Sequence, residues 1–294
     1  MELLQLKYFC TVAKLEHMTR AAQELRIAQP ALSKTIARLE KDVGVPLFDR
    51  DGRQIRLNAF GKAFLHKVEA ALALLEEGQK EVSDLAGLEQ GSIHLAASTL
   101  DRLSEPLSQF LALHPKVNFR ITQASMQKMA HLIEAGEVDI CFPPLPMQRP
   151  DFSAVSVLNE EVYLAVPPAH RLAGLPSVRL EEVADEPFIG YKEGYHFQIM
   201  NEDFFRTAGI SPHFVCRVDE PSSIAKLVAS GLGVALVGNC GGANSRLHLL
   251  SIEYPVCRRH FQIVWHNKRY LSKAARHFSD FVVEYFERNG AADS

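Results

Sequence analysis

The sequence predicts a chain of several domains: an α-helical head with a small β wing, a long linker helix, and a two-lobed α/β body. Three observations support this fold class. Two short helical patterns joined by about three residues occur near the start of the chain. A stretch with heptad spacing follows, and from residue 91 onward strand-like runs alternate with helical patterns. A length of 294 residues also exceeds what one simple core usually holds.

The composition, with 47% hydrophobic and 23% charged residues, is typical of a soluble globular protein. The first residues carry charges at positions 2, 7, 14 and 16, so we expect no secretory signal, and no apolar run is long enough for a membrane span. Five cysteines are scattered and never form a C-x-x-C pair, which favours a reducing compartment. We therefore expect a cytoplasmic protein whose cysteines fill the core; a redox-sensing thiol is the alternative.

The net charge of −3 conceals an asymmetry along the chain. Residues 1–60 hold 10 Lys and Arg against 7 Asp and Glu, whereas the remaining residues hold 22 against 28. A basic head on an acidic body indicates that only the head meets a polyanion such as nucleic acid.

Three helices are expected in the head. In the first, Leu6, Phe9 and Ala13 recur at the spacing of a buried stripe. The second begins at Thr19, which we expect to be its N-cap. The third spans residues 26 to 44, so a helix-turn-helix covers about residues 18–37. In such a motif the second helix enters the major groove of DNA.

The third helix has a buried side and a polar side. Its apolar stripe consists of Leu32, Ile36, Leu39 and Val43. Pro30 in the first turn costs no intrahelical hydrogen bond, and Gln29 beside it can offer its amide to a base edge. Ser33 and Lys34 lie one turn further on, within reach of a base or a phosphate. A merely solvated helix face is the alternative interpretation.

Residues 44–58 predict a two-stranded wing. A short apolar plug, residues 45–48, precedes a turn at Asp51-Gly52. Three arginines are interleaved with apolar residues here, namely Arg50, Arg53 and Arg56. Arginines on the exposed side of a wing suit the phosphates that flank a groove.

The head contains a set of residues at fixed spacing: Ala21-Ala22, Leu25, Gln29-Pro30, Ser33, Ile36, Leu39-Glu40, Gly44, Leu47-Phe48 and Arg50. With them, residues 18–50 resemble the winged helix-turn-helix of the LysR-type transcriptional regulators. The resemblance implies DNA contacts by Thr19, Gln29, Pro30, Ser33, Lys34, Arg38, Arg50, Arg53 and Arg56. Two positions depart from the family. Ala28 replaces a serine, which removes an N-cap worth about 1 kcal/mol, and Asn58 replaces a threonine at the next helix start, where Asn caps equally well.

Residues 59–88 form the predicted linker helix. The positions that recur at 4-3 spacing are Phe64, Val68, Ala71, Leu75, Gly78, Val82 and Leu85. About 30 residues give a rod of roughly 45 Å, which cannot bury such a seam on a small neighbouring domain. We therefore expect a homodimer through this helix, weakened locally by Gly78; packing against the chain's own body is the alternative.

Residues 91–294 predict two α/β lobes with mostly parallel sheets. Strand-like runs cover residues 93–97, 117–122, 138–142, 162–166, 188–190, 214–218, 234–237 and 261–265. Helix-like runs cover residues 105–113, 126–135, 200–208, 224–230 and 272–288. Their alternation predicts βαβ units, with a proline-studded joint at residues 167–176. We place lobe I at about residues 91–162 plus 268–294 and lobe II at about residues 163–267.

Ligands bind open α/β sheets beyond the carboxyl ends of the strands. The residues expected there are Ser98, Thr99, Leu100, Ser125, Met126, Pro143, Tyr191, Lys192, His196, Gly238 and Asn239. Hydroxyls and helix N-termini favour a small anion such as a carboxylate, and we expect Lys192 and His196 to add positive charge. A simple capping role is the alternative for Ser98 and Ser125.

The motifs GEVDI, PPAHRLA, DEPFIGY and IAKLVASGLGVALV extend the resemblance through the body. They are similar to the effector-binding domain of LysR-type regulators, itself similar to periplasmic solute-binding proteins. The resemblance implies a sequence-specific regulator of transcription whose promoter activity is switched by a small effector. It also implies double-stranded DNA with an inverted-repeat operator as a partner, a tetramer built from dimers, and RNA polymerase as a further candidate partner. Gly238 departs from the family, which usually has proline there.

Enzyme motifs are missing from the sequence. The glycines of GLGVALVG follow a helix and precede a strand, the reverse of a phosphate-binding loop. The 12 histidines contain no H-x-x-x-H pair, and no G-x-S-x-G elbow occurs. We therefore expect no catalysis, no metal and no cofactor. A free-standing solute-binding protein is the other class, which the N-terminal head disfavours.

Overall fold

The computed structural model describes residues 1–51, 54–85, 91–219, 222–238 and 247–290. The chain divides into two compact units: Met1–Glu89 with Glu134–Val138, and Gln90–Ile133 with Asp139–Ser294. Among the described residues, no helix is both long and apolar enough to cross a membrane.

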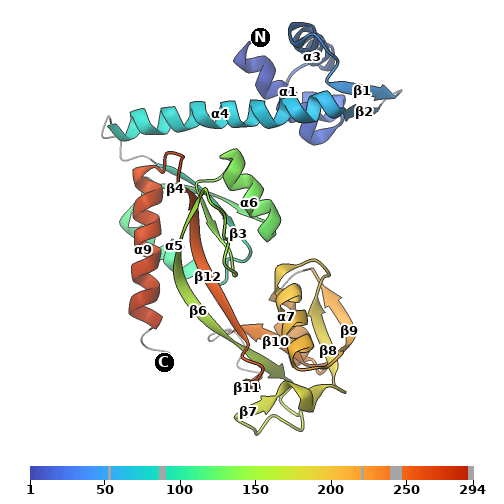
Figure 1. The fold of residues 1–294 in the computed structure, drawn as a ribbon, viewed down its shortest axis with the longest axis vertical. Coiled ribbons are helices and arrows are strands. Elements are labelled where there is room, and N and C mark those ends of the chain that lie inside the picture. Colours follow the sequence, from blue (N-terminus) through green and yellow to red (C-terminus); the bar gives the residue numbers. More distant parts are fainter. Residues whose placement is uncertain (52–53, 86–90, 220–221, 239–246, 291–294) are drawn as a thin grey trace. The chain divides into compact units, whose positions relative to one another are not determined.

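The first unit contains the head and the long helix (Figure 1). Its elements are α1 Leu3–Leu15, α2 Met18–Glu24, α3 Gln29–Val43, β1 Phe48–Asp51, β2 Gln54–Leu57 and α4 Ala59–Leu85. The third helix begins at Gln29 rather than at residue 26. Arg26 has a left-handed backbone (φ 54°) and Ala28 is extended, so the chain turns sharply before the helix starts.

The core of the first unit lies among α1, α3, α4 and the wing. Phe9 packs against Phe48 and Phe64, with ring centroids 5.5 and 5.4 Å apart. Leu32, Ile36 and Leu39 of α3 are fully buried, which confirms the predicted stripe except at half-buried Val43. The opposite side of α3 is thereby left to solvent.

The start of α2 differs from the expectation. His17 is the N-cap, and its Nδ1 accepts a hydrogen bond of 3.3 Å from the backbone N–H of Arg20. Thr19 lies inside the helix, so its prediction as the N-cap was wrong. The sequence rule prefers hydroxyl and carboxamide caps and overlooks an imidazole nitrogen that can accept the same bond.

Asn58 and Gly61 fix the start of α4 against the wing. Asn58 Oδ1 accepts from Gly61 N–H at 2.8 Å, which confirms the expected cap, and Asn58 Nδ2 donates to the Pro46 carbonyl at 3.0 Å. A side chain at Gly61 would place its Cβ 2.1 Å from the Leu47 carbonyl oxygen. Glycine is therefore required for this close approach.

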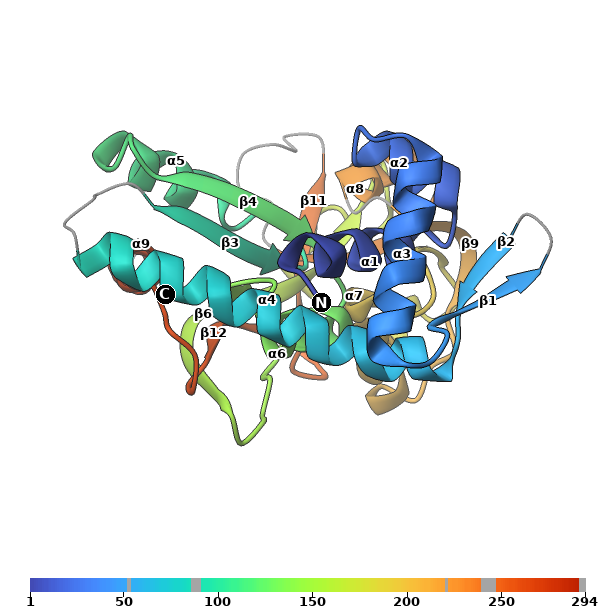
Figure 2. The ribbon, with the colours of Figure 1, turned by 90° about the horizontal axis from the view of Figure 1, so that it is seen from above.

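The second unit contains the α/β body. Its strands are β3 Ser92–Ala97, β4 Asn118–Gln123, β5 Ile140–Phe142, β6 Phe152–Val166, β7 Ser177–Arg179, β8 Pro187–Tyr191, β9 His213–Val218, β10 Ala235–Gly238, β11 His248–Tyr254 and β12 Arg258–His266. Its helices are α5 Ser104–Leu113, α6 Met126–Ala135, α7 His196–Thr207, α8 Ser222–Ala229, α9 Lys273–Gly290 and the 3₁₀ turn Leu180–Val183. Parallel β3 and β4 lie side by side in both views (Figures 1 and 2).

The large sheet is mixed rather than mostly parallel. Its strand order is β4-β3-β5-β12-β6-β11-β7, with β10 also paired to β6. Strand β6 pairs antiparallel with β12, β10 and β11, so the expectation of mostly parallel sheets was wrong. The sequence pattern marked only the five apolar residues at the end of β6, because the earlier part of this strand is polar and partly exposed.

Strand β6 also changes partners along its length. Residues 152–161 pair with β12, whereas residues 162–166 pair with β10 and β11. Strand β12 in turn pairs with β5, so it continues the sheet of β3 and β4. Residues 258–266 therefore lie beside the strands of lobe I. We had expected them in lobe II, at about residues 163–267.

Two hydrophobic clusters fill the second unit. In the first, Phe110 of α5 and Phe278 of α9 meet edge to face, with centroids 5.1 Å apart, near β3 and β12. The second lies around the end of β6, where Phe188 of β8 contacts Phe205 of α7 at 5.0 Å. Beyond the partner change, alternate residues of β6 enter different cores: Ala165 belongs to the first cluster, and Val162, Leu164 and Val166 belong to the second.

Candidate nucleic-acid interface and effector site

The polar side of α3 is accessible at the position where the sequence predicts base contacts. Gln29, Pro30 and Lys34 are exposed, and Ser33 is half-buried. Ala28 is the N-cap residue and makes no side-chain cap bond, but its carbonyl accepts from the N–H groups of Ala31 and Leu32 at 3.0 and 3.1 Å. Pro30 has no N–H, so the tip of the helix offers chiefly the amide side chain of Gln29.

Further basic and polar side chains of the head are also exposed. Arg38 on α3 pairs with Glu2 at 3.3 Å, and both side chains are exposed to solvent. Arg56 on β2 is exposed and lies opposite Asp49 in the hairpin. Thr19 is exposed on α2. Arg50 lies on β1, but its side chain and all of Arg53 are outside the described residues.

Two glutamates hold the wing to the helices. Glu40 of α3 accepts hydrogen bonds from the backbone N–H groups of Leu47 and Phe48, at 2.8 and 3.2 Å. Glu16 accepts from the N–H of Leu57 at 2.9 Å. These charge-assisted bonds orient the hairpin relative to the C-terminal half of α3 and the end of α1.

Ser98 and Thr99 close β3 in a buried turn. The Ser98 carbonyl accepts from Tyr195 Oη and from Gln123 Nε2, both at 3.1 Å. Thr99 Oγ1 accepts from the N–H of Asp101 at 3.3 Å, and the next residue, Leu100, is exposed. Ser98 is fully buried, and its Oγ has no hydrogen-bond partner among the described residues. A capping role does not account for this hydroxyl.

Other predicted contacts have structural roles. Ser125 is exposed, and its Oγ accepts from the N–H of Lys128 at 3.3 Å, as an N-cap does; half-buried Met126 begins α6. Pro143 is buried, and its carbonyl accepts from the N–H of Gln262 at 3.1 Å. The capping alternative therefore holds for Ser125.

Of the two groups expected to supply positive charge, one lies at the surface and the other is buried and uncharged. Lys192 is exposed and pairs with exposed Asp219 at 3.2 Å, close behind buried Tyr191. His196 is buried at the start of α7, where desolvation and the nearby Arg259 lower its pKa to about 3. His196 is therefore neutral at pH 7, and its predicted positive charge was wrong. The burial of His196 and the proximity of Arg259 could not be read from the local sequence.

The structure instead brings together three charged residues that sequence reasoning missed. Arg259 of β12 and Glu160 of β6 are opposite each other in the strand pairing, and their side chains are 4% and 5% exposed. Arg102 contacts the other oxygen of Glu160. The only sequence signal was their position just before the apolar runs 162–166 and 261–265, where charge is unusual in a strand.

Gly238, at the end of β10, lies against the same carboxylate. A Cβ built at Gly238 would be 2.5 Å from both carboxylate oxygens of Glu160. Asn239, the neighbouring candidate, lies outside the described residues. Gly238 therefore contributes space for Glu160 rather than a ligand-binding backbone.

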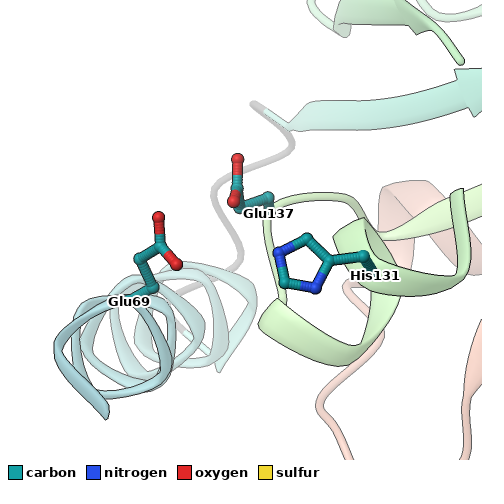
Figure 3. Close-up of side chains that lie close together, drawn as sticks. All are labelled: Glu69, His131 and Glu137. Carbon is teal, nitrogen blue, oxygen red and sulfur yellow. The ribbon is translucent and has the colours of Figure 1, made fainter. Parts of the chain in front are cut away.

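Two of the described cysteines, and one group of possible metal ligands, lie outside this buried cluster. Burial raises the pKa of Cys10 to about 11 and that of Cys257 to about 12, which keeps both thiols protonated at neutral pH. Figure 3 draws three side chains of metal-ligating type, Glu69 on α4, His131 on α6 and Glu137 after α6. They come from different units of the chain, so we assign them no metal site.

Two protein-family models match this chain. Residues 3–62 match the model described as "Bacterial regulatory helix-turn-helix protein, lysR family". Residues 86–287 match the "LysR substrate binding domain". The chain belongs to the LysR family of transcriptional regulators. This confirms the resemblance seen in the sequence, and with it a helix-turn-helix head followed by a two-lobed effector-binding domain.

Relatives and solved structures agree with this assignment. The uncharacterized HTH-type transcriptional regulator YybE of Bacillus subtilis is 34% identical, over 97% of this chain and 99% of that protein. The transcriptional dual regulator GltC of B. subtilis is 30% identical over 98% of each. Full-length OxyR from Pseudomonas aeruginosa has a TM-score of 0.73 at 22% identity, covering 96% of this chain and 94% of that one. CbnR complexed with its target DNA has a TM-score of 0.71 at 23% identity, covering 98% and 99%.

Proposed function

We propose that this LysR-family regulator binds an inverted-repeat operator in a sequence-specific manner through the exposed tip of α3. The observation that carries this proposal is the division of α3, with Leu32 and Ile36 fully buried and Gln29 and Lys34 exposed. A glutamine amide at a helix tip suits an adenine edge in the major groove. Support also comes from CbnR, which shares the fold and was solved with its target DNA.

In this proposal, two copies of the chain form a dimer, and each copy supplies one DNA-binding head. The second half of α4 exposes Leu74, Leu75, Val82 and Leu85, at 54% to 79%. Such a run of exposed leucine and valine favours a second helix as its partner. A homodimer through α4 then matches a two-fold operator, and tetramers and contacts with RNA polymerase belong to the same proposal.

The body senses a small anionic effector between its lobes. The carboxyl end of β3, the start of α7 and the partner change in β6 bring Ser98, His196, Arg259 and Glu160 into one buried cluster. Binding of the effector shifts the population between lobe arrangements and thereby changes promoter activity. We assign no catalytic role to this chain. We propose a cytoplasmic location, because the operator DNA that it would bind lies there.

Replacing Gln29 with alanine tests the reading role. Gln29→Ala should reduce the discrimination between matched and mismatched operator sites by about 1–3 kcal/mol. Arg56→Ala is the matched comparison, because a phosphate contact should weaken all sites alike and lower the salt slope by about one unit. Footprints or binding isotherms on paired sites measure both effects. If Gln29→Ala discriminates between matched and mismatched sites as well as the wild type does, the tip of α3 does not read the base sequence.

A further inference from the structure

Two buried charged residues lie at the point where β6 exchanges β12 for β10 and β11. Glu160 and Arg259 are the only Asp, Glu, Lys or Arg residues that are buried within the described part of the chain. Arg259 Nη1 is 3.7 Å from Glu160 Oε2, which is too long for a hydrogen bond. Glu160 is instead held by Arg102 through its other oxygen.

The guanidinium of Arg259 has an unused edge. Its Nε and Nη2 are buried and have no hydrogen-bond partner among the described residues. Buried charged donors without an acceptor are costly, and a purely structural ion pair would leave this cost in place. The Nε and Nη2 atoms form the edge that binds a carboxylate with two parallel hydrogen bonds. The geometry of the donors therefore fits one carboxylate group.

The surroundings hold this guanidinium in place. The ring of Phe197 lies 4.0 Å from Arg259 Cζ in a cation–π contact. Phe197 belongs to the first turn of α7, whose N-cap residue Tyr195 makes no side-chain cap bond. The positive end of a helix of 12 residues therefore lies beside Arg259 and adds to the preference for an anion.

Neutral polar atoms surround the same position. Both ring nitrogens of His196 and Ser98 Oγ are buried without a hydrogen-bond partner among the described residues. The Tyr195 ring lies 4.2 Å from the His196 ring, and Tyr195 Oη donates to the Ser98 carbonyl. The three residues thus belong to one cluster with Arg259. The buried polar atoms of this cluster that lack a hydrogen-bond partner match a ligand with one carboxylate and at least one hydroxyl group.

The charge of the cluster limits the ligand further. Arg102, Glu160 and Arg259 together carry one net positive charge, and Lys192 is paired with Asp219 at the surface. We propose that Arg259 anchors the carboxylate of a small hydroxymonocarboxylate, while Ser98 and His196 bind its hydroxyl. This rests on the proposed function, because it takes the body to be the effector-binding domain.

Glu160 is the internal competitor of that carboxylate. It lies opposite Arg259 in the strand pairing, and the missing side chain at Gly238 leaves the space that its carboxylate occupies. This accounts for glycine at a position where we noted a departure from the family's proline. Removing the charge of Glu160 should therefore strengthen the binding of a monocarboxylate rather than weaken it.

Thermal stability of the full-length protein tests the proposal. Glycolate, lactate, glycerate and larger hydroxymonocarboxylates are compared with their amides, which keep the shape and lose the charge. We expect at least one acid to raise the melting temperature of the wild-type protein, while its amide does not. Arg259→Lys keeps the charge but loses the two-bond edge, so titration calorimetry should show binding weaker by about tenfold or more.

Matched variants separate charge from geometry. The double variant Arg259→Gln with Glu160→Gln keeps the net charge of the cluster, avoids an unpaired buried carboxylate, and should lose the response. Arg258→Gln removes an exposed arginine from the neighbouring position on β12 and should keep it. Glu160→Gln alone should bind the same acid more tightly than the wild type.

The outcomes distinguish this inference from the proposed function. If no acid stabilises the wild-type protein, or if the folded double variant responds like Arg258→Gln, the assignment of Arg259 is wrong. Operator binding by the wild-type protein is measured in the same preparation. Specific operator binding without any carboxylate response overturns the inference alone, whereas a carboxylate response without operator binding overturns the proposed function alone.

Discussion

At the scale of single residues, the head shows how one acceptor atom decides where a helix begins. Asn58 caps α4 through Gly61, as its side-chain chemistry predicts. Ala28 provides no such bond for α3, although its backbone is extended as a cap requires. His17 takes the place that the sequence assigned to Thr19. Local chemistry thus predicts the N-cap correctly when only one residue near the helix start offers a suitable acceptor, as at Asn58.

Two substitutions should therefore have opposite effects on stability. Asn58→Ala removes the cap and should lower the free energy of unfolding by about 1–2 kcal/mol. Ala28→Ser adds a hydroxyl acceptor at an extended position and should raise it by about 0.5–1 kcal/mol. Denaturant unfolding of the full-length protein measures both. Changes of the same sign would contradict the capping account.

His196 should make stability depend on pH. Its pKa is about 3 in the folded protein, because burial and Arg259 disfavour the charged form, and 6.5 is its ordinary value. The unfolded chain then binds the extra proton first, so stability is fully present above pH 6.5 and declines as the pH falls toward about 3. The limiting slope for one proton is about 1.4 kcal/mol per pH unit.

The His196→Gln variant should lose this part of the slope between pH 6.5 and 5, whereas exposed His248→Gln should keep it. Unfolding curves at several pH values provide the comparison. An equal slope in the wild-type protein and His196→Gln would mean that His196 is protonated in the folded state as readily as in the unfolded one.

At the scale of elements, α4 divides its apolar seam between two tasks. Val68 is buried and Phe64 is packed in the core of the head, whereas Leu75, Val82 and Leu85 are exposed. The heptad spacing alone did not separate these halves. The division follows from the reach of the head, which covers only the first turns of the helix. The remaining turns need another surface.

Charges placed in the exposed half of the seam should dissociate the proposed dimer. In Leu75→Glu with Val82→Glu, two carboxylates on each helix would be buried and would repel those of the partner. We expect a monomer in sedimentation or light scattering, with weakened binding to an inverted repeat. Lys80→Glu changes the net charge equally from the opposite side of α4 and should stay dimeric. A dimeric double variant would assign the interface to another surface.

At the scale of the whole molecule, regulation requires that effector binding and DNA binding are coupled. Such coupling is reciprocal, because both events act on the same equilibrium between states. A carboxylate that changes operator affinity by a factor of about 5 to 150 must have its own affinity changed by the same factor when operator DNA is present. Calorimetric titrations with and without the operator measure the two factors. Equal carboxylate affinity with and without the operator would mean that the carboxylate does not regulate DNA binding.

The sequence by itself determined the family, the helix-turn-helix, the linker helix and the alternation of strands and helices in the body. These features depend on neighbours within one or two turns, such as the stripe of Leu32, Ile36 and Leu39. The rule that ligands bind beyond the carboxyl ends of strands also pointed to Ser98 and His196, and both lie in the buried cluster.

Only the tertiary structure decided the direction of β6 and β12, the neutral state of His196 and the meeting of Glu160 with Arg259. These residues are far apart in the chain, and the charge state of His196 depends on its burial and on Arg259 rather than on its own spacing. Burial in a folded core changes the free energy of an ion by several kcal/mol, and no local pattern records that change. For that reason the sequence assigned a positive charge to His196, which the fold keeps neutral, and did not single out Arg259.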